Sequence, residues 1–200
     1  MDDIVVEFYA GKYENMINKN SLYYSYDFPE QEVKIYVEKI ISEPIDRYIV
    51  YIKSLKEREQ ITAKDVFQFS DIEDATDNIC EKVKANNNPG MNYIDVGKIL
   101  LDDGKIRKNG AYINYGENHV KTAEAIGLFF ELSRTYFLSC LGYVYCDLSK
   151  EDKQKLLTRL LLRNRLIVRM MQASENGNIN AREFFYMLSD STYLRRRSNV

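Results

Sequence analysis

The chain reads NYIDVGKILLDDGKIRKNGAYINYGENHVKTAEAIGLFFELSRTYFLSCLGYVYCDL from Asn92 to Leu148, and this stretch decides the fold. Asn92 is a residue type that commonly caps a helix, and apolar residues then recur at helical spacing as far as Leu101. The run Asp102-Asp103-Gly104 predicts a turn that ends this helix. A second helix is predicted from Asn109 to Ile126, so the order begins as helix, short turn, helix.

A β-hairpin is predicted directly after the second helix. The runs Leu128–Leu132 and Thr135–Leu138 are rich in aromatic and aliphatic residues and flank Ser133-Arg134, which suits strand, tight turn and strand. Gly116 weakens the preceding helix by about 1 kcal/mol relative to Ala. The helix could therefore be kinked at Gly116 or begin nearer Glu117, or the cost could be tolerated for a close approach of another backbone segment.

This order of elements resembles a winged helix-turn-helix DNA-binding module, and the resemblance covers residues 92–148. In that family the second helix of the motif enters the major groove, and the hairpin, or wing, lies along the DNA backbone or minor groove. The resemblance implies contacts with duplex DNA from two sets of residues. The base-facing residues would be Asn114, Asn118, His119 and Lys121. The phosphate-binding residues would be Lys105, Arg107, Lys108 and Arg134. Winged helices also serve as protein-protein modules, so an adaptor function stays open.

Charge is distributed unevenly along the chain. Residues 1–88 carry 11 Lys and Arg against 18 Asp and Glu, residues 89–152 carry 7 against 9, and residues 153–200 carry 10 against 3. The acidic start and basic end favour a molecule with one end suited to phosphates. A basic tail that pairs with the acidic part of the same chain, or of a dimer mate, is the alternative. We predict that three consecutive arginines contact phosphates: Arg195, Arg196 and Arg197. The alternative is that they form a run of charges exposed to solvent without a ligand.

A long Leu-rich helix is predicted from Ser149 to Ala173, with Ser149 as its cap. Its apolar residues cover more than half of the helix circumference, which predicts packing against the core on one side and against a protein partner or homodimer mate on the other. The following residues 188–200 resemble the tail of winged-helix proteins that accompany bacterial restriction and phage-defence systems. That resemblance implies a DNA-binding or adaptor subunit of a restriction, phage-defence or regulatory system rather than the nuclease itself.

The predicted fold class is therefore mainly α, a winged helix with a small two-stranded β-wing plus N- and C-terminal helical parts. The polar loop Asn86–Gly90 marks the predicted domain boundary. The predicted domains are an acidic, Tyr-rich helical domain at 1–88, a winged-helix domain at 89–148 and a basic helical tail at 149–200.

Several function classes lack a sequence signature. No apolar run approaches the roughly 20 residues of a membrane span, and the chain start has no signal-peptide pattern, so a cytoplasmic protein is predicted. The cysteines Cys80, Cys140 and Cys146 match no zinc spacing, and no metal or cofactor is predicted. No catalytic triad or phosphate-binding loop occurs, which favours a non-enzymatic protein. The less favoured alternative is a Mg²⁺-dependent nuclease that uses Asp27, Glu32 and Lys34.

Overall fold

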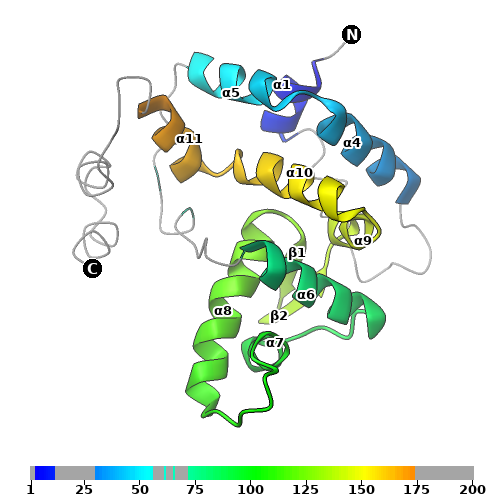
Figure 1. Cartoon of the computed structure of the whole chain (residues 1–200), viewed down its shortest axis with the longest axis vertical. Coiled ribbons are helices and arrows are strands. Elements are labelled where there is room, and N and C mark those ends of the chain that lie inside the picture. Colours follow the sequence, from blue (N-terminus) through cyan, green and yellow to red (C-terminus); the bar gives the residue numbers. More distant parts are fainter. Residues whose placement is uncertain (1–2, 12–29, 56–60, 62–64, 66–71, 174–200) are drawn as a thin grey trace.

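A computed structural model describes residues 3–11, 30–55, 61, 65 and 72–173, and confirms a mainly helical fold with a two-stranded antiparallel sheet (Figure 1). The N-terminal helices are α1 (Ile4–Tyr9), α4 (Glu30–Ser42) and α5 (Ile45–Ser54). The middle of the chain forms α6 (Ile72–Ala85), α7 (Tyr93–Leu100), α8 (Asn109–Ala125), β1 (Phe129–Leu132) and β2 (Thr135–Leu138). The remaining helices are α9 (Cys140–Cys146), α10 (Lys150–Leu161) and α11 (Arg165–Ala173).

The N-terminal helices pack against the C-terminal ones, with α4 against α10 and α5 against α11 (Figure 1). The Tyr48 hydroxyl of α5 donates to the carbonyl of Ile40 at 3.0 Å and ties α5 to α4. Arg159 of α10 reaches the connection between these two helices and donates to the carbonyl of Glu43 at 2.7 Å. Chain segments far apart in the sequence therefore share one hydrophobic core.

The middle elements form a second group of contacts, called here the hairpin unit (residues 72–148). Helix α6 packs against α7, α8, α9 and β2. It does so through a buried face that includes Ala75, Ile79 and Val83. In the sequence, the predicted domain boundary at residue 88 therefore separates α6 from the elements against which α6 packs.

Helix α7 begins as the sequence predicts, at an Asn92 cap. The Asn92 side chain accepts from the backbone N–H groups of Ile94 and Asp95, at 2.9 and 3.1 Å. The Asp95 carboxylate in turn accepts from the backbone N–H of Asn92 at 3.2 Å, which completes a capping box. The helix start is thus fixed by local hydrogen bonds that the sequence encodes.

Helices α7 and α8 approach so closely that backbone meets backbone. A Cβ atom placed on Gly116 would lie 1.9 Å from the carbonyl oxygen of Tyr93, and one on Gly97 would lie 2.0 Å from the carbonyl oxygen of Tyr112. Each helix thus contributes one glycine to the contact. The predicted close approach at Gly116 is confirmed, and Gly97 is its counterpart on the other helix.

The hairpin has the predicted strands and turn. Phe129 pairs with Leu138 and Leu132 pairs with Thr135 in antiparallel register. Ser133 and Arg134 both have positive φ, 52° and 64°, the combination that matches the twist of a two-residue hairpin turn. The backbone of Met91 pairs with β2 as a third segment. The Met91 N–H donates to the carbonyl of Tyr136 at 2.9 Å, and the Tyr136 N–H donates to the carbonyl of Met91 at 2.8 Å.

The C-terminal part differs from the prediction, because the single helix expected from Ser149 to Ala173 is two helices. The predicted cap is confirmed, since Ser149 Oγ accepts from the backbone N–H of Asp152 at 3.1 Å. The chain then turns after α10, and Asn164 Oδ1 accepts from the backbone N–H of Ile167 at 3.2 Å to cap α11. An Asn side chain competes well for such N–H groups, which favours a new helix start over a continuous helix.

Most of the Leu-rich surface is buried within the chain. Five of its members are at most 7% exposed: Leu156, Leu157, Leu160, Leu162 and Leu166. Leu161 and Ile167 are half-buried and Met170 is 47% exposed, so part of this surface remains accessible. Among the described helices none has the length and apolarity needed to cross a membrane.

Candidate nucleic-acid interface

Helix α8 has one face turned to solvent. Asn114, Asn118 and Lys121 are exposed and follow one another at helical spacing of four and three residues. Ala111 and Ala125 continue the same exposed line toward the two ends of the helix. The structure therefore brings three of the four predicted base-facing residues together on one surface, called here the α8 face (Ala111, Asn114, Asn118, Lys121 and Ala125).

His119 does not belong to the α8 face, which corrects the prediction that it faces bases. Its side chain is only 3% exposed, and it lies on the inward stripe of α8 together with Gly116 and Ala123. Its ring centroid is 4.6 Å from that of Tyr115. Residues three and four positions apart share a helix face, so the burial of Gly116 and Ala123 draws His119 into the interior.

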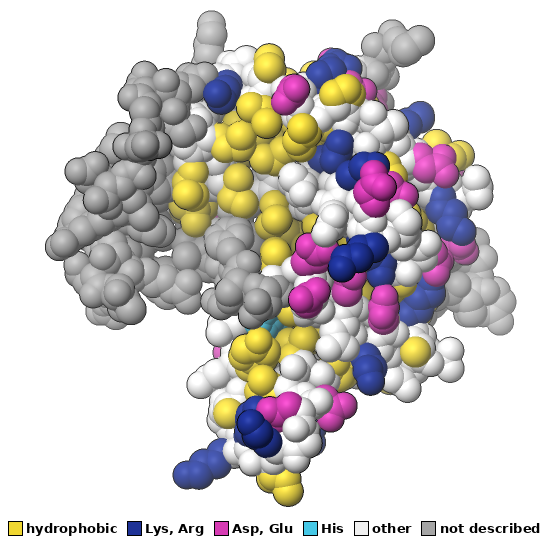
Figure 2. Space-filling view, viewed as in Figure 1, with side chains coloured by type: hydrophobic (Ala, Val, Ile, Leu, Met, Phe, Trp, Pro, Cys, Tyr) yellow, Lys and Arg dark blue, Asp and Glu magenta, His cyan; other side chains and the backbone are white. Residues whose placement is uncertain are grey.

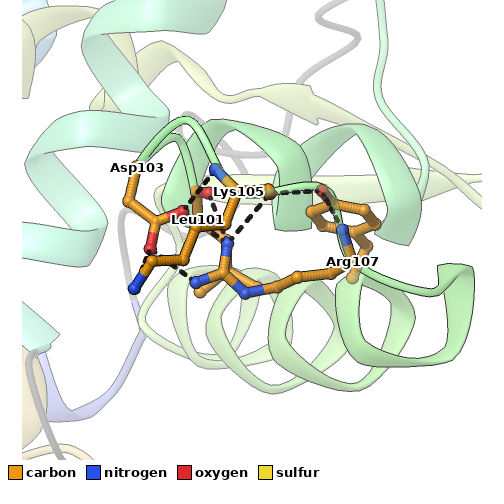
Figure 3. A network of polar contacts seen from close by, with 5 residues as sticks. Leu101, Asp103, Lys105 and Arg107 are labelled. Carbon is orange, nitrogen blue, oxygen red and sulfur yellow. Dashed lines mark hydrogen bonds and ion pairs between the residues drawn. The ribbon is translucent and has the colours of Figure 1, made fainter.

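The turn between α7 and α8 is built around Arg107 (Figure 3). Its guanidinium donates to both carboxylate oxygens of Asp103 at 2.6 Å, and also to the carbonyl of Leu101 at 3.1 Å. Hydrogen bonds from Arg107 lower the pKa of the Asp103 carboxyl to about 2. Arg107, a predicted phosphate contact, thus holds the turn together, and its charge is largely matched by Asp103.

The other predicted cations near this turn remain accessible. Lys105 and Lys108 are exposed, and the Lys105 side chain is 78% exposed, with its Nζ 3.9 Å from Asp103. Lys108 stands at the cap position of α8 and makes no side-chain capping hydrogen bond. Between them lies Ile106, which is 99% exposed and which no sequence motif singles out.

Lys121 links the α8 face to α7. Its ammonium group forms an ion pair with Glu117 one turn earlier and lies 5.6 Å from the ring centroid of Tyr93. The hydrogen bond to Glu117 raises the pKa of Lys121, so the ammonium form is favoured. The ion pair also offsets part of the positive charge that Lys121 would present to a phosphate.

A chain of side-chain contacts continues from Tyr93 into the hairpin. The hydroxyls of Tyr93 and Tyr136 are 2.9 Å apart, and the Tyr136 hydroxyl donates to Glu131 at 3.3 Å. The same Glu131 carboxylate accepts from the backbone N–H of Arg134 at 3.1 Å. The hairpin turn is therefore connected through two tyrosines to the helices beside it, and Arg134 is held exposed at its tip.

Two of the basic residues of α10 are buried and do not add to an exposed positive surface, whereas Lys150 is exposed and Lys155 is partly exposed. Lys153 is 6% exposed and forms ion pairs with Glu81 and Asp77, at 2.8 and 3.7 Å. Arg159 is also 6% exposed and binds backbone carbonyls. The predicted contacts Arg195, Arg196 and Arg197 lie outside the described residues.

On the face shown in Figure 2, Lys and Arg side chains are interleaved with Asp and Glu side chains rather than gathered in one basic patch. The same mixture holds around the α8 face, where Glu117 pairs with Lys121 and Asp103 pairs with Arg107. On this face and around the α8 face, neighbouring opposite charges therefore reduce the long-range attraction of phosphates.

Two of the three residues of the alternative nuclease site lie on α4. Asp27 lies outside the described residues, Glu32 is exposed on α4, and Lys34 pairs with Glu30. Within the ranges that the structure describes, no group of three or more His, Cys, Asp or Glu residues is placed to hold a metal ion.

Comparison with known proteins finds no matching family model, no matching curated protein and no matching solved structure.

Proposed function

We propose that the hairpin unit is a winged-helix module that binds double-stranded DNA, and that the protein is a non-enzymatic binding subunit. The observation that carries the proposal is the α8 face, where Asn114, Asn118 and Lys121 are exposed on one side of a regular helix. A helix of this kind fits the major groove, where Asn can form two hydrogen bonds with adenine and Lys can donate to guanine or to phosphate.

The hairpin tip supplies a second, independent support. Arg134 adopts a φ of 64°, a left-handed conformation that costs a non-glycine residue about 1 kcal/mol. Gly or Asn would occupy this turn position at lower cost. An exposed arginine at such a position suggests that its guanidinium binds a ligand. A phosphate contact fits the charge and the exposure of this group.

The proposal is tested by fluorescence anisotropy with a labelled duplex of mixed sequence, titrated with the full chain over a series of salt concentrations. We expect binding at low salt that weakens as salt rises, with a slope of about −0.9 per phosphate contacted. We expect Asn114→Ala/Asn118→Ala to weaken binding roughly ten-fold or more, since each bidentate base contact is worth about 1–3 kcal/mol. Asn78→Ala, a change of the same kind at an exposed position of α6, is the matched control.

Arg134→Ala is expected to reduce the salt slope by about 0.9, the contribution of one phosphate contact. Lys39→Ala, which removes an exposed cation on α4, should leave the slope unchanged. A wild-type chain that fails to bind the duplex even at the lowest salt excludes the proposal.

A protein-binding adaptor is the second candidate, and one observation favours it. Ile106 is 99% exposed at the tip of the α7–α8 turn, and Leu132 at the end of β1 is 43% exposed. Exposed apolar side chains at loop tips suit insertion into a pocket of another protein. If this function holds and the partner is a second copy, sedimentation velocity at micromolar concentration should show self-association that Ile106→Ser abolishes.

The place of such a subunit in a bacterial restriction, phage-defence or regulatory system rests on the sequence resemblance alone and stays a prediction.

A further inference from the structure

An Asn-Gly pair opens helix α8, at Asn109 and Gly110, and both residues are exposed. Several other asparagines of the described structure are engaged through their side chains. Asn88 forms two hydrogen bonds with the backbone of β2, and Asn92 and Asn164 cap helices. Among the described residues, by contrast, no hydrogen bond holds the side-chain amide of Asn109. This amide is therefore open to water and free to rotate.

The described structure also leaves open space around Gly110. A Cβ atom placed on Gly110 would have no other atom within 4 Å, whereas one placed on Gly116 of the same helix would lie 1.9 Å from a carbonyl oxygen. The first N–H groups of a helix have no partner within the helix. Lys108, at the cap position, supplies no side-chain capping hydrogen bond. The Gly110 backbone nitrogen therefore has an unhindered approach to the side-chain carbonyl carbon of Asn109.

We propose that Asn109 is a deamidation site, at which water converts the side-chain amide to a carboxylate and ammonia is released. In the first step the Gly110 backbone nitrogen attacks the Asn109 side-chain carbonyl carbon and closes a succinimide ring. The amide nitrogen leaves as ammonia, with the proton that the Gly110 nitrogen loses. In the second step water adds to one ring carbonyl and the bond from that carbon to the ring nitrogen breaks. The product is aspartate or isoaspartate, which ionises at neutral pH and adds one negative charge.

The position of Asn109 in the helix permits the first step. Ring closure requires the Asn109 backbone to leave the helical conformation. Because Asn109 is the first residue of α8, this change opens the first turn, in which the Ala111 N–H donates to the carbonyl of Lys108 at 2.9 Å. Helix ends open locally at a small fraction of the free energy of global unfolding. Asn114 and Asn118 lie inside α8 and are followed by bulkier residues, so the same reaction there would break the helix.

The new carboxylate would lie at the start of the proposed DNA-reading helix. It would directly follow the exposed Lys108 and offset the attraction of that cation for a phosphate. DNA affinity should therefore fall as the protein deamidates. This consequence rests on the proposed function, whereas the deamidation of Asn109 does not.

The test incubates the full-length wild-type chain at mildly alkaline pH and maps its tryptic peptides by mass spectrometry at several times. Trypsin cleaves after Lys108 and Lys121, so one peptide contains Asn109 together with Asn114 and Asn118 as internal controls. We expect fragment ions to place the gain in mass at Asn109 and to show intact amides at the other two positions. A parallel sample unfolded in urea should lose the Asn109 amide at a rate within roughly ten-fold of the folded chain, because a helix end opens at little cost.

Gly110→Ala is the matched variant, because the added methyl group has room and restricts the backbone on which ring closure depends. It should slow the loss of the Asn109 amide about five-fold or more. Persistence of this amide in the folded wild type after the unfolded sample has lost it overturns the proposal. Faster loss at Asn114 or Asn118 overturns it equally. Both of these results come from the wild type, so a variant that fails to fold does not affect the test.

Fluorescence anisotropy with duplex DNA separates the reaction from its consequence. We expect Asn109→Asp to bind about three-fold more weakly than Asn109→Gln, which keeps a neutral amide, and the difference to shrink as salt rises. If the wild type binds no duplex, the proposed function fails while the peptide map still decides the deamidation. Equal binding by the two variants, beside a wild type that binds, contradicts the consequence for DNA alone.

Discussion

The hydroxyl of Tyr93 lies 2.9 Å from the hydroxyl of Tyr136, and this contact joins the first turn of α7 to the second strand of the hairpin. The two rings also lie against each other, with centroids 5.5 Å apart. Tyr136 is 1% exposed, so its hydroxyl depends on protein partners, whereas Tyr93 is half-buried. The Tyr93–Tyr136 contact therefore adds a side-chain hydrogen bond to the backbone hydrogen bonds that Met91 forms with the hairpin.

Removal of either hydroxyl should lower the free energy of unfolding by about 1 kcal/mol, the usual net worth of a hydrogen bond. Urea unfolding of Tyr93→Phe, Tyr136→Phe and the double variant measures the coupling between them. We expect the double variant to lose less than the sum of the two single losses, by about 0.5–1.5 kcal/mol. Tyr93→Phe combined with Tyr145→Phe, whose hydroxyl binds Asp77, should show additive losses. Additivity in the Tyr93 and Tyr136 pair would contradict the contact.

Substitution of the glycines through which α7 and α8 touch should separate the effect of helix propensity on stability from the effect of packing. Alanine is the better helix former by about 1 kcal/mol. Nevertheless, Gly97→Ala and Gly116→Ala should each be strongly destabilising, because the new methyl group would lie about 2 Å from a backbone carbonyl oxygen. Gly110→Ala is the control. Gly110 lies on the same helix as Gly116, but a Cβ atom placed on it would have no other atom within 4 Å. Thermal unfolding should show a lower Tm for the first two variants and an unchanged or higher Tm for the third.

The Asp103–Arg107 pair should make stability sensitive to acid. Arg107 lowers the pKa of Asp103 from 3.8 to about 2 in the folded chain, so the pair stabilises the fold above pH 3.8. That contribution is lost as the pH falls through 3.8 toward 2. The difference in Tm between wild type and Asp103→Asn should therefore be present at about pH 6 and shrink in this acid range. A carboxyl ¹³C titration of Asp103 with a midpoint near about 4, the ordinary value for Asp, would contradict the prediction.

The hairpin turn offers a variant in which stability and binding should change in opposite directions. Ser133→Asn/Arg134→Gly replaces two residues at positive φ with the pair that this turn type favours. We expect unfolding free energy to rise by about 1 kcal/mol or more while DNA affinity and its salt slope fall. Ser133→Asn alone keeps the guanidinium and should gain stability without weaker binding. A double variant that binds DNA as tightly as wild type would remove Arg134 from the proposed interface.

Local sequence signals predict the elements of the hairpin unit well. The Asn92 cap and the turn at Ser133-Arg134 depend on residues that are neighbours in the chain. Such features follow from backbone geometry, which a short stretch of sequence encodes. The prediction of a single helix over 149–173 is wrong. The continuous apolar pattern of this segment outweighs the weak local signal at Asn164, which caps a new helix.

The candidate site is less predictable, because exposure and charge pairing depend on tertiary contacts. The sequence pattern places His119 on the exposed face, although its neighbours on the inward stripe of α8 draw it into the interior. Lys153 and Arg159 count as free cations in the sequence. In the structure Lys153 pairs with Glu81 and Arg159 donates to the backbone carbonyl of Glu43, and both of these residues lie far away along the chain. A charge count along the chain cannot show which charges meet in the folded molecule.

The α8 face has a consequence for how this protein can change. Its five residues are exposed, while the opposite side of the same helix carries the glycine contact with α7 and the buried His119, Val120 and Ala123. Substitutions on the outer side should therefore leave the scaffold intact, as surface changes away from caps and packing usually alter stability by less than about 0.5 kcal/mol. Evolution, or a combinatorial library at these five positions, can thus alter what the helix recognises without rebuilding the fold that presents it.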